Sequence, residues 1–390
     1  MTEIANTPEL RFPNYENSWF SYKLNDISER VTRKNKNLES QRPLTISGQL
    51  GLIDQIEYFN KSVSSKNLTG YTLIKKGEFA YNKSYSNGYP LGAIKKLERY
   101  DLGILSSLYI CFSFDENIDK SFMKNYFEST KWYREVANIA VEGARNHGLL
   151  NIPVNDFFNI NINLPIQYEQ EKIGEFFSKL DRQIELEEQK LEKLEEQKKG
   201  YMQDIFSQQL RFKDENGNDY PEWKEKKLYD VVKYLSSKHS SNHYSENIIN
   251  GEYPVYDAIR EISRDINFDV EKSYISILKD GAGVGRLNLR PGKSSVIGTM
   301  GYILPQNIDI NFLFYYLKTM NFSKYVIGST IPHLYFKDYS KETILVPIDK
   351  NEQIKIGSFL IKLDHIIENK VKKIEILKKR KQGFLQKMFV

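Results

Sequence analysis

The sequence predicts an α+β protein in which two globular segments alternate with two long helices that pair as an antiparallel coiled coil. Three observations predict this: a repeated helical motif, a heptad pattern in both copies, and opposite net charges on the two helices. The expected parts are domain 1–165, helix 166–208, domain 209–347 and helix 348–390. This order also predicts a circular, pseudo-twofold arrangement in which the second helix ends near the start of the chain.

The repeat is clearest in two stretches of thirteen residues. Residues 169–181, EQEKIGEFFSKLD, and residues 352–364, EQIKIGSFLIKLD, are identical at nine positions. The same offset relates GYMQDIF at 200–206 to GFLQKMF at 383–389. Internal repetition on this scale indicates that one structural unit is used twice.

A weaker repeat lies upstream of each helix. Leu10-Arg11-Phe12 recurs as Leu210-Arg211-Phe212, and the pattern Trp-x-x-x-Lys-Leu-x-Asp recurs from Trp19 and from Trp223. Between these edges the two segments differ in sequence. Each mixes short strand-like runs with helical pieces, which favours a compact α+β domain.

Apolar residues in both helical copies follow steps of four and three, which is the spacing of a heptad seam. The predicted seam residues are Ile173, Phe177, Leu180, Ile184, Leu191 and Leu194 in the first helix, and Ile356, Leu360, Leu363, Ile367, Ile374 and Leu377 in the second. Charged residues interrupt both seams at equivalent places: Glu187 and Lys198, then Lys370 and Lys381. A helix of about 40 residues in water needs a partner for such a seam.

The natural partner of each helix is the other one. Residues 166–206 carry a net charge of −4 and residues 349–390 a net charge of +6, so pairing them is favourable. Exposed ion pairs contribute only tenths of a kcal/mol each. The alternative is that each helix pairs with a helix of another chain.

Composition places the chain among ordinary globular proteins. Of its 390 residues, 40% are hydrophobic and 27% charged, and the single cysteine, Cys111, allows no intramolecular disulfide. The first ten residues lack the layout of a signal peptide, and no apolar run approaches the ~20 residues that span a bilayer. We therefore expect a cytoplasmic protein without membrane contact.

A glycine-rich run, Gly-Ala-Gly-Val-Gly at 281–285, follows a predicted strand. A dinucleotide site would need a helix to begin at once, but the next residues, RLNLRPGKSS, show no helical periodicity. The run therefore predicts a tight turn or a close approach of backbone to a ligand such as a DNA phosphate, because Lys279, Arg286, Arg290 and Lys293 surround it. The plain alternative is a glycine hairpin with solvated basic neighbours.

Motifs for catalysis are missing from the sequence. There is no phosphate-binding GxxxxGK[ST], no Asn-Pro-Pro-aromatic loop of amino-methyltransferases and no GxSxG. The five histidines, His147, His239, His243, His333 and His365, do not have the spacing of metal ligands. We expect neither a catalytic residue nor a metal site, although the sequence leaves open a nuclease site built from scattered carboxylates.

Two unlike segments joined by two near-identical helices resemble the specificity subunit of type I restriction-modification systems. Leu164-Pro165-Ile166 before Glu169-Gln170 and Ile173 is similar to the family's junction between domain and helix, and Val346-Pro347-Ile348 before Glu352-Gln353 and Ile356 is its second copy. Gly328-Ser329-Thr330 with Leu334 looks like the end of a target-recognition domain. The first domain departs from this pattern, since it has Gly143-Ala144-Arg145-Asn146-His147-Gly148 there.

The resemblance implies that each domain is a target-recognition domain reading one half of a split, asymmetric site in double-stranded DNA, and that the helices fix the gap. It also implies two methyltransferase subunits using S-adenosylmethionine, and two restriction subunits that need ATP and Mg. This chain would bind no cofactor and catalyse nothing by itself. The alternatives are a self-sufficient DNA-modifying enzyme and a coiled-coil adaptor that does not bind DNA.

Charge does not locate the DNA contacts, because both large segments are nearly neutral. Loop residues able to bind bases or phosphates are the candidates, since Arg and Lys favour guanine and phosphate and Asn favours adenine. They are Lys83, Ser84, Tyr85, Arg145, Asn146 and His147 in the first domain, and Lys279, Arg286, Lys293 and His333 in the second. The plain alternative for each is a solvated loop residue.

Overall fold

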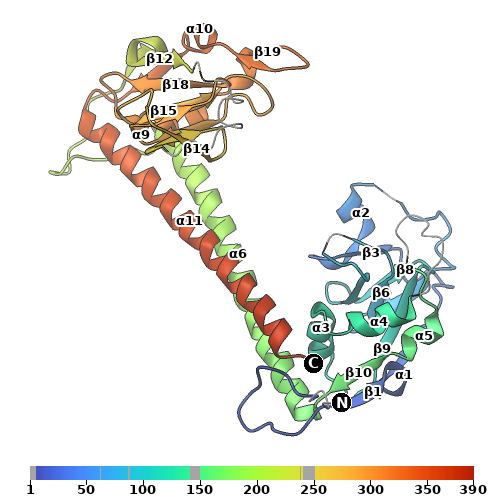
Figure 1. Cartoon of the computed structure of the whole chain (residues 1–390). Helices are drawn as coiled ribbons and strands as arrows, with labels where there is room; N and C mark the ends of the chain where they lie inside the picture. Colours follow the sequence, from blue (N-terminus) through green and yellow to red (C-terminus); the bar gives the residue numbers. More distant parts are fainter. Residues whose placement is uncertain (1–5, 62, 87, 141–149, 238, 240–250) are drawn as a thin grey trace. The chain divides into compact units, whose positions relative to one another are not determined.

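The structure is a computed structural model, and it describes residues 6–61, 63–86, 88–140, 150–237, 239 and 251–390. The chain forms two compact units: unit 1 is Met1–Glu188 with Lys373–Val390, and unit 2 is Gln189–Lys372. Each unit holds one domain of mixed helices and strands, together with one end of both long helices, α6 (Gln167–Phe206) and α11 (Lys350–Lys387) (Figure 1). The predicted α+β fold is confirmed.

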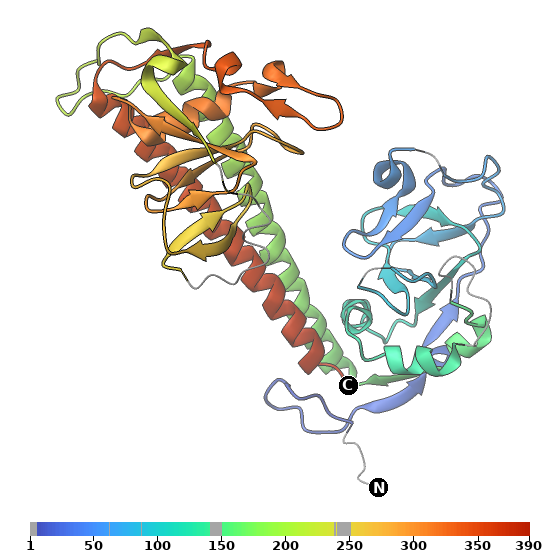
Figure 2. The ribbon, with the colours of Figure 1, turned by 45° about the horizontal axis from the view of Figure 1, so that its top comes forward.

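The long helices α6 and α11 lie side by side and run in opposite directions (Figures 1 and 2). In unit 1 the ring centroids of Phe176 and Phe384 are 5.1 Å apart, and in unit 2 those of Tyr201 and Phe359 are 5.2 Å apart. Because later residues of α6 meet earlier residues of α11, the pair is antiparallel. Each helix therefore has its partner within the same chain.

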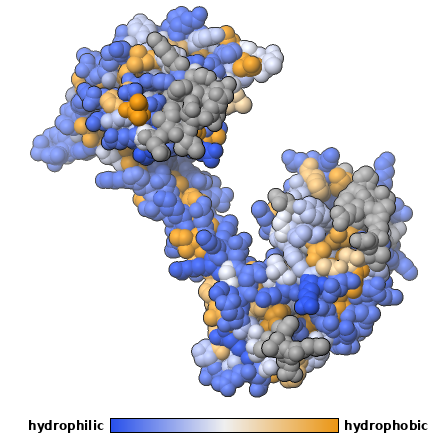
Figure 3. All heavy atoms as spheres, viewed as in Figure 1, coloured by the Kyte–Doolittle hydropathy of each residue, from blue (hydrophilic) through white to orange (hydrophobic). Residues whose placement is uncertain are grey.

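The seam between the helices is apolar and shielded from water. Every one of the twelve predicted seam residues is buried or half-buried: Ile173, Phe177, Leu180, Ile184, Leu191, Leu194, Ile356, Leu360, Leu363, Ile367, Ile374 and Leu377. The outer surface of the pair is mostly hydrophilic in the face that Figure 3 shows. The helices are thus amphipathic, as the heptad steps predict.

Charged residues that interrupt the seam form ion pairs across it. In unit 1 Lys381 lies 2.6 Å from Asp181, and in unit 2 Lys198 pairs with the equivalent carboxylate, Asp364. Glu187 is only 7% exposed and accepts a hydrogen bond of 3.1 Å from Lys373. Such half-buried pairs fix register, because a shifted helix would leave a charge in the apolar seam without its partner.

The two domains contain four-stranded antiparallel sheets of the same order. In unit 1 the order is β2 (Ser28–Arg30), β9 (Tyr109–Phe114), β6 (Phe79–Asn82) and β7 (Ala93–Lys96). In unit 2 it is β12 (Val232–Ser236), β18 (Met300–Pro305), β15 (Tyr274–Leu278) and β16 (Leu287–Arg290). Two segments that differ in sequence therefore share one sheet topology.

Smaller elements complete each unit. Unit 1 also contains β1 (Phe20–Lys23), α1 (Leu24–Ile27), β3 (Leu44–Ser47), β4 (Gly51–Asp54), α2 (Gln55–Phe59), β5 (Thr72–Lys75), β8 (Leu102–Leu105), α3 (Lys120–Glu128), α4 (Tyr133–Ile139), α5 (Val154–Phe158) and β10 (Asn161–Leu164). Unit 2 also contains β11 (Lys224–Lys227), α7 (Leu228–Val231), β13 (Tyr253–Tyr256), β14 (Glu261–Asp265), β17 (Ser295–Val296), α9 (Ile310–Thr319), η1 (Phe322–Tyr325), β19 (Val326–Ile327), β20 (His333–Leu334), α10 (Phe336–Tyr339) and β21 (Thr343–Val346). The first and last strands of each domain pair with each other: β1 pairs with β10, and β11 pairs with β21.

The start and the end of the chain meet in unit 1, as the repeat predicts. The Leu10 amide donates a 2.8 Å hydrogen bond to the carbonyl of Lys387, and the Lys387 ammonium lies 2.7 Å from Glu9. The Trp19 ring packs 6.3 Å from that of Phe389. The N-terminal segment is thereby held against the last turn of α11.

A buried ion pair holds the N-terminal segment of each half against the first turn of its helix. Arg11 donates two 2.7 Å hydrogen bonds to Glu169, whose side chain is fully buried. The hydrogen bonds that Arg11 donates to Glu169 raise the pKa of the Arg11 guanidinium. Arg211 and Glu352 repeat the contact at 3.0 Å, and the Glu352 side chain is also fully buried.

The glutamine after each buried glutamate joins the domain to the helix. The Gln170 side chain accepts a hydrogen bond from the Asp119 amide at 3.1 Å and donates to the Pro165 carbonyl at 2.9 Å. Gln353 does the same with Asp309 at 2.7 Å and with the Pro347 carbonyl at 2.8 Å. Each glutamine therefore connects the start of α3 or α9 to the chain that leads into the long helix.

The glycine of each repeat allows a close approach of two helices. A Cβ atom at Gly174 would lie 2.4 Å from Asp119 Oδ1 and 3.0 Å from the Phe122 nitrogen, at the beginning of α3. A Cβ at Gly357 would lie 2.9 Å from the Phe312 nitrogen, at the beginning of α9. Any larger residue would push the domain away from the helix pair.

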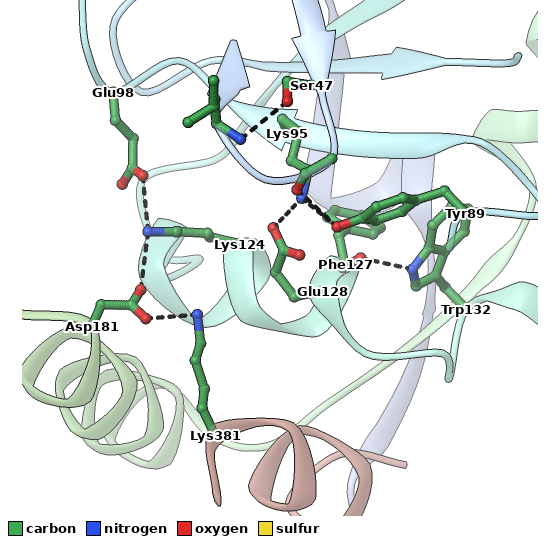
Figure 4. Close-up of polar contacts among 12 residues, drawn as sticks. Ser47, Tyr89, Lys95, Glu98, Lys124, Phe127, Glu128, Trp132, Asp181 and Lys381 are labelled. Carbon is green, nitrogen blue, oxygen red and sulfur yellow. Dashed lines mark hydrogen bonds and ion pairs between the residues drawn. The ribbon is translucent and has the colours of Figure 1, made fainter. Parts of the chain in front are cut away.

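A ladder of alternating charges crosses from the domain of unit 1 to the helix pair (Figure 4). Lys124 on α3 lies 2.8 Å from Glu98 and 3.3 Å from Asp181, which Lys381 also contacts. Burial alone would lower the pKa of Lys124, but the two carboxylates outweigh it and raise the pKa. In unit 2 the Tyr315 hydroxyl donates to Asp364 instead, so a neutral donor occupies the place of the lysine.

We predict that Arg11→Ala lowers the free energy of unfolding by about 3 kcal/mol or more, because it leaves a buried carboxylate without its cation. Urea denaturation followed by circular dichroism measures the change. The double variant Arg11→Ala/Glu169→Gln should recover part of the loss. Lys76→Ala, which removes an exposed partner of Asp101, is the control and should change little. Equal effects of the two single substitutions would contradict the prediction.

Candidate nucleic-acid interface

Two loops occupy the same place in the two sheets. Loop 83–92 joins β6 to the edge strand β7, and loop 279–286 joins β15 to the edge strand β16. Five of the candidate DNA contacts predicted from the sequence lie on them: Lys83, Ser84, Tyr85, Lys279 and Arg286. We name these two segments the reading loops.

A second segment runs against the first residue of each reading loop. The Leu150 amide donates to the Lys83 carbonyl at 2.9 Å, and the Leu334 amide donates to the Lys279 carbonyl at 2.8 Å. The equivalence of these bonds places Leu150 and Leu334 in corresponding positions. The candidates Arg145, Asn146 and His147, just before Leu150, lie outside the described residues.

In unit 1 the reading loop is anchored at its far side and exposed near its start. The Tyr85 side chain is 62% exposed, whereas the Tyr89 hydroxyl donates to the Gly48 carbonyl at 2.8 Å. Tyr89 also receives a hydrogen bond from Lys95, a buried lysine that pairs with Glu128 at 2.6 Å (Figure 4). Tyr85 can therefore meet a ligand while the base of the loop stays fixed.

In unit 2 the reading loop is built on glycines. Gly281, Gly283 and Gly285 all have positive φ angles, of 94°, 83° and 90°, which L side chains rarely adopt. The chain then enters strand β16 at Leu287 rather than a helix. This arrangement is a tight hairpin and lacks the helix N-terminus that binds a dinucleotide pyrophosphate.

A carboxylate lies among the cations of this loop. Asp280 accepts a 2.8 Å hydrogen bond from His333 Nδ1 and pairs with the Lys279 ammonium. Partial burial alone would raise the pKa of the Asp280 carboxyl, but the hydrogen bonds from Lys279 and His333 outweigh it, so the pKa is lowered. Lys279 and His333, two candidates chosen separately from the sequence, are thus brought together by a third residue.

Lys293 lies away from the other candidates. It is exposed in the turn after β16, where its amide donates to the Glu271 carbonyl at 3.1 Å. Since Arg290 of β16 is opposite Tyr274, the first residue of β15, Lys293 lies beyond the end of the hairpin opposite to the reading loop. The structure brings Lys279 and His333 together, places Arg286 opposite Leu278 in the same hairpin, and leaves Lys293 apart from them.

Sequence reasoning missed Asp280. Its partner His333 is 53 positions away along the chain, so only the tertiary fold reveals the contact. One sequence feature could have indicated it: Asp280 is an acidic residue between a strand and a glycine run, and the other charged residues beside that run are cations.

Metal-ligand clusters and membrane-spanning helices are both lacking in the part of the chain that the structure describes. There, no group of three or more His, Cys, Asp or Glu side chains is placed to hold a metal ion. None of the helices in the same residues is long and apolar enough to cross a membrane.

The family profile described as "Type I restriction modification DNA specificity domain" matches residues 3–196 and 220–379 of this sequence. The chain belongs to this family. The two matched regions cover both domains and most of both long helices. The family resemblance expected from the junction motifs is therefore confirmed.

Curated relatives and solved structures agree with the family. A protein of Mycoplasma genitalium described as a type I specificity subunit is 28% identical over 146 residues, which is 36% of this chain and 38% of that protein. The specificity subunit of the type I restriction enzyme MjaVIII from Methanocaldococcus jannaschii is 27% identical over 72% of this chain and 69% of its own length. The chain thus matches well under half of the first relative.

The fold matches two solved structures over nearly the whole chain. One is the S subunit of a type I restriction-modification system from M. genitalium, with a TM-score of 0.62, 18% identity, and coverage of 98% of this chain and 99% of that one. The other comes from a study of complex assembly in the type I system, with a TM-score of 0.58, 17% identity, and coverage of 96% and 99%. At these identities the likeness establishes the fold.

We predict that Asp280→Asn increases DNA affinity at low salt and steepens the salt dependence. The substitution removes an anion and frees Lys279 to neutralise a phosphate, so the slope of log K against log salt should become more negative by about one. A salt titration of duplex binding measures it. Glu271→Gln makes the same charge change at the opposite end of the hairpin and is the matched control. If both variants change the slope equally, Asp280 has no special place at the interface.

Proposed function

We propose that this chain reads a bipartite DNA target, with one recognition domain for each half-site. Family membership supports DNA recognition, and one structural observation carries the finer proposal. Two domains of unlike sequence present a loop at the same position of the same sheet. A scaffold kept constant under variable loops is the arrangement expected of two readers with different targets.

The half-sites read by the two loops are unlike. The first reading loop is KSYSNGYPLG, rich in hydroxyl groups and with one cation, whereas the second is KDGAGVGR, with two cations and one carboxylate. Base edges in the major groove are distinguished by their donors and acceptors, so loops with different side chains select different bases. The target is therefore asymmetric.

The paired helices set the gap between the half-sites and hold the partner subunits. Their antiparallel pairing, with charges matched across the seam, supports a rigid spacer. Half-sites on one face of B-DNA must be spaced by about a helical turn, so a spacer of fixed length imposes a fixed gap. We infer that two methyltransferase subunits bind the helices and domains, and that two restriction subunits join them.

In this proposal the chain provides recognition and its partners provide the chemistry. S-adenosylmethionine would be bound by the methyltransferase subunits, and ATP with Mg by the restriction subunits. Two other functions, a self-sufficient DNA-modifying enzyme and an adaptor that does not bind DNA, make different predictions for the isolated chain. Methylation, cleavage and gel-shift assays with and without the methyltransferase subunits separate the three.

Lengthening both helices should lengthen the gap alone. Seven residues inserted after Glu188 in α6 and seven before Lys373 in α11 keep the heptad phase, and should add about three base pairs to the unspecified gap, because a heptad is ~10.5 Å long. Methylation mapping of a genome or plasmid library reads out the site. Seven residues inserted at the exposed Asp214–Asn218 turn are the control. An unchanged gap in the helix variant would refute the spacer role.

Replacing one domain should change one half-site. Exchange of residues 221–347 for the corresponding segment of another family member keeps Arg211, Glu352 and both long helices, so the junctions can still form. Long-read methylation mapping should then show a new second half, the old first half and the old gap. A variant that methylates sites with both halves altered would show that the domains do not read independently.

A further inference from the structure

The β19–β20 hairpin of unit 2 carries an exposed apolar tip. Ile327 and Ile331 are 53% and 57% exposed, and the residues between them, Gly-Ser-Thr at 328–330, are exposed too. The hairpin extends outward from the domain, beyond the edge of the neighbouring strands (Figure 2). Within the part of the chain that the structure describes, neither isoleucine belongs to an apolar core cluster.

The tip is locked to the reading loop of unit 2. The Gly281 amide donates to the Pro332 carbonyl at 2.9 Å, and the Leu334 amide donates to the Lys279 carbonyl at 2.8 Å. Asp280 and His333 face each other as a β-bridge and share a side-chain hydrogen bond. Ile331 directly precedes Pro332, which is bonded to the reading loop. Contact of the reading loop with DNA therefore brings Ile331 close to the same DNA surface.

The turn requires glycine at position 328. Gly328 has a φ of 88°, and a Cβ atom there would lie 2.4 Å from the Ile331 carbonyl oxygen. Only glycine permits this close crossing of the chain. The backbone of Ile331 therefore packs directly against Gly328.

The surroundings of the tip suit a nucleic acid. The segment 321–337 contains no acidic residue, although Lys324, His333 and Lys337 lie in it. The Lys337 ammonium lies 5.4 Å from the centre of the exposed Tyr335 ring, and the His333 ring is nearly parallel to that ring. The nearby carboxylate of Asp280 is already paired with Lys279 and His333, and Lys324 and Lys337 lie in the same segment as the tip. An exposed apolar point in such surroundings matches the chemistry of wedges that separate stacked bases.

We infer that the β19–β20 tip is such a wedge, and that Ile331 enters the base stack at the half-site read by unit 2. The inference rests on the proposed function. Methylation of a base inside a duplex requires that base to leave the stack, which costs energy. An isoleucine that separates the neighbouring step would lower that cost for the methyltransferase subunit.

The wedge is tested in the complex of the full chain with its methyltransferase subunits. Duplexes carry 2-aminopurine at successive positions of the unit 2 half-site, and the fluorescence reports unstacking. The wild-type complex should give a rise at one step, and Ile331→Ala should lose most of it. Ile331→Ala should also methylate this half-site about tenfold more slowly, while the ratio of specific to nonspecific binding stays unchanged.

Three comparisons separate a wedge from a structural role. Ile331→Leu should retain the fluorescence rise, because it keeps the apolar volume. A mismatch at the methylated base, which lowers the cost of unstacking, should restore methylation by Ile331→Ala. Ile259→Ala, at a 72% exposed isoleucine in the turn between β13 and β14, is the matched control and should behave as wild type.

Two outcomes overturn the wedge. One is an Ile331→Ala complex with the wild-type fluorescence rise and methylation rate. The other is an Ile331→Ala complex that loses affinity without any fluorescence change, by the same amount as the wild-type complex loses when a thymine is replaced by deoxyuridine. This result would assign Ile331 to a contact with the thymine methyl group. If the wild-type complex binds no specific duplex at all, the proposed function fails instead, so the two failures are distinguishable.

Discussion

The buried ion pair between Arg11 and Glu169, with its copy between Arg211 and Glu352, is the contact on which the architecture depends. A glutamate in the first turn of a helix interacts favourably with the helix dipole. Full burial of its charged carboxylate would cost several kcal/mol of desolvation free energy without a cation beside it. The guanidinium supplies two hydrogen bonds in a plane that matches the carboxylate. Each pair thereby ties an otherwise extended segment to the start of a long helix. The direction in which that helix leaves its domain is set at this point.

This constraint explains why the sequence repeats where it does. The identical residues act at the junction or in the seam. The glutamate and the glutamine bind the domain, and the glycine allows the close approach of α3 or α9. The aspartate of each copy pairs with a lysine of the other long helix. The reading loops take no part in those contacts. They can therefore differ between the two domains without cost to the scaffold.

The sequence was sufficient for the helices and the junctions, because both have local patterns. Heptad steps identified seam residues such as Phe177 and Leu360, and the repeat identified Glu169 and Glu352. The common sheet order was hidden, since β6 and β15 share a position in a sheet but no residue pattern. For the interface, the glycine run predicted the tight hairpin at 281–285. It could not predict that Asp280 would join Lys279 to His333, because that contact depends on how distant strands fold together. Whether these residues bind DNA remains a prediction.

The placement of Asp280 bears on how a nearly neutral protein can discriminate between DNA sequences. Phosphate contacts give affinity without sequence information, and base contacts give the information. A carboxylate beside Lys279 reduces attraction to any phosphate, so it weakens binding to all sequences alike. It can accept a hydrogen bond only from a base that offers a donor, such as the amino group of cytosine. An acid in a DNA-reading loop therefore lowers nonspecific affinity more than affinity for a matching site, and discrimination increases because the wrong sites are penalised. Under the proposed function, the low net charge of the domains contributes to their selection of a target.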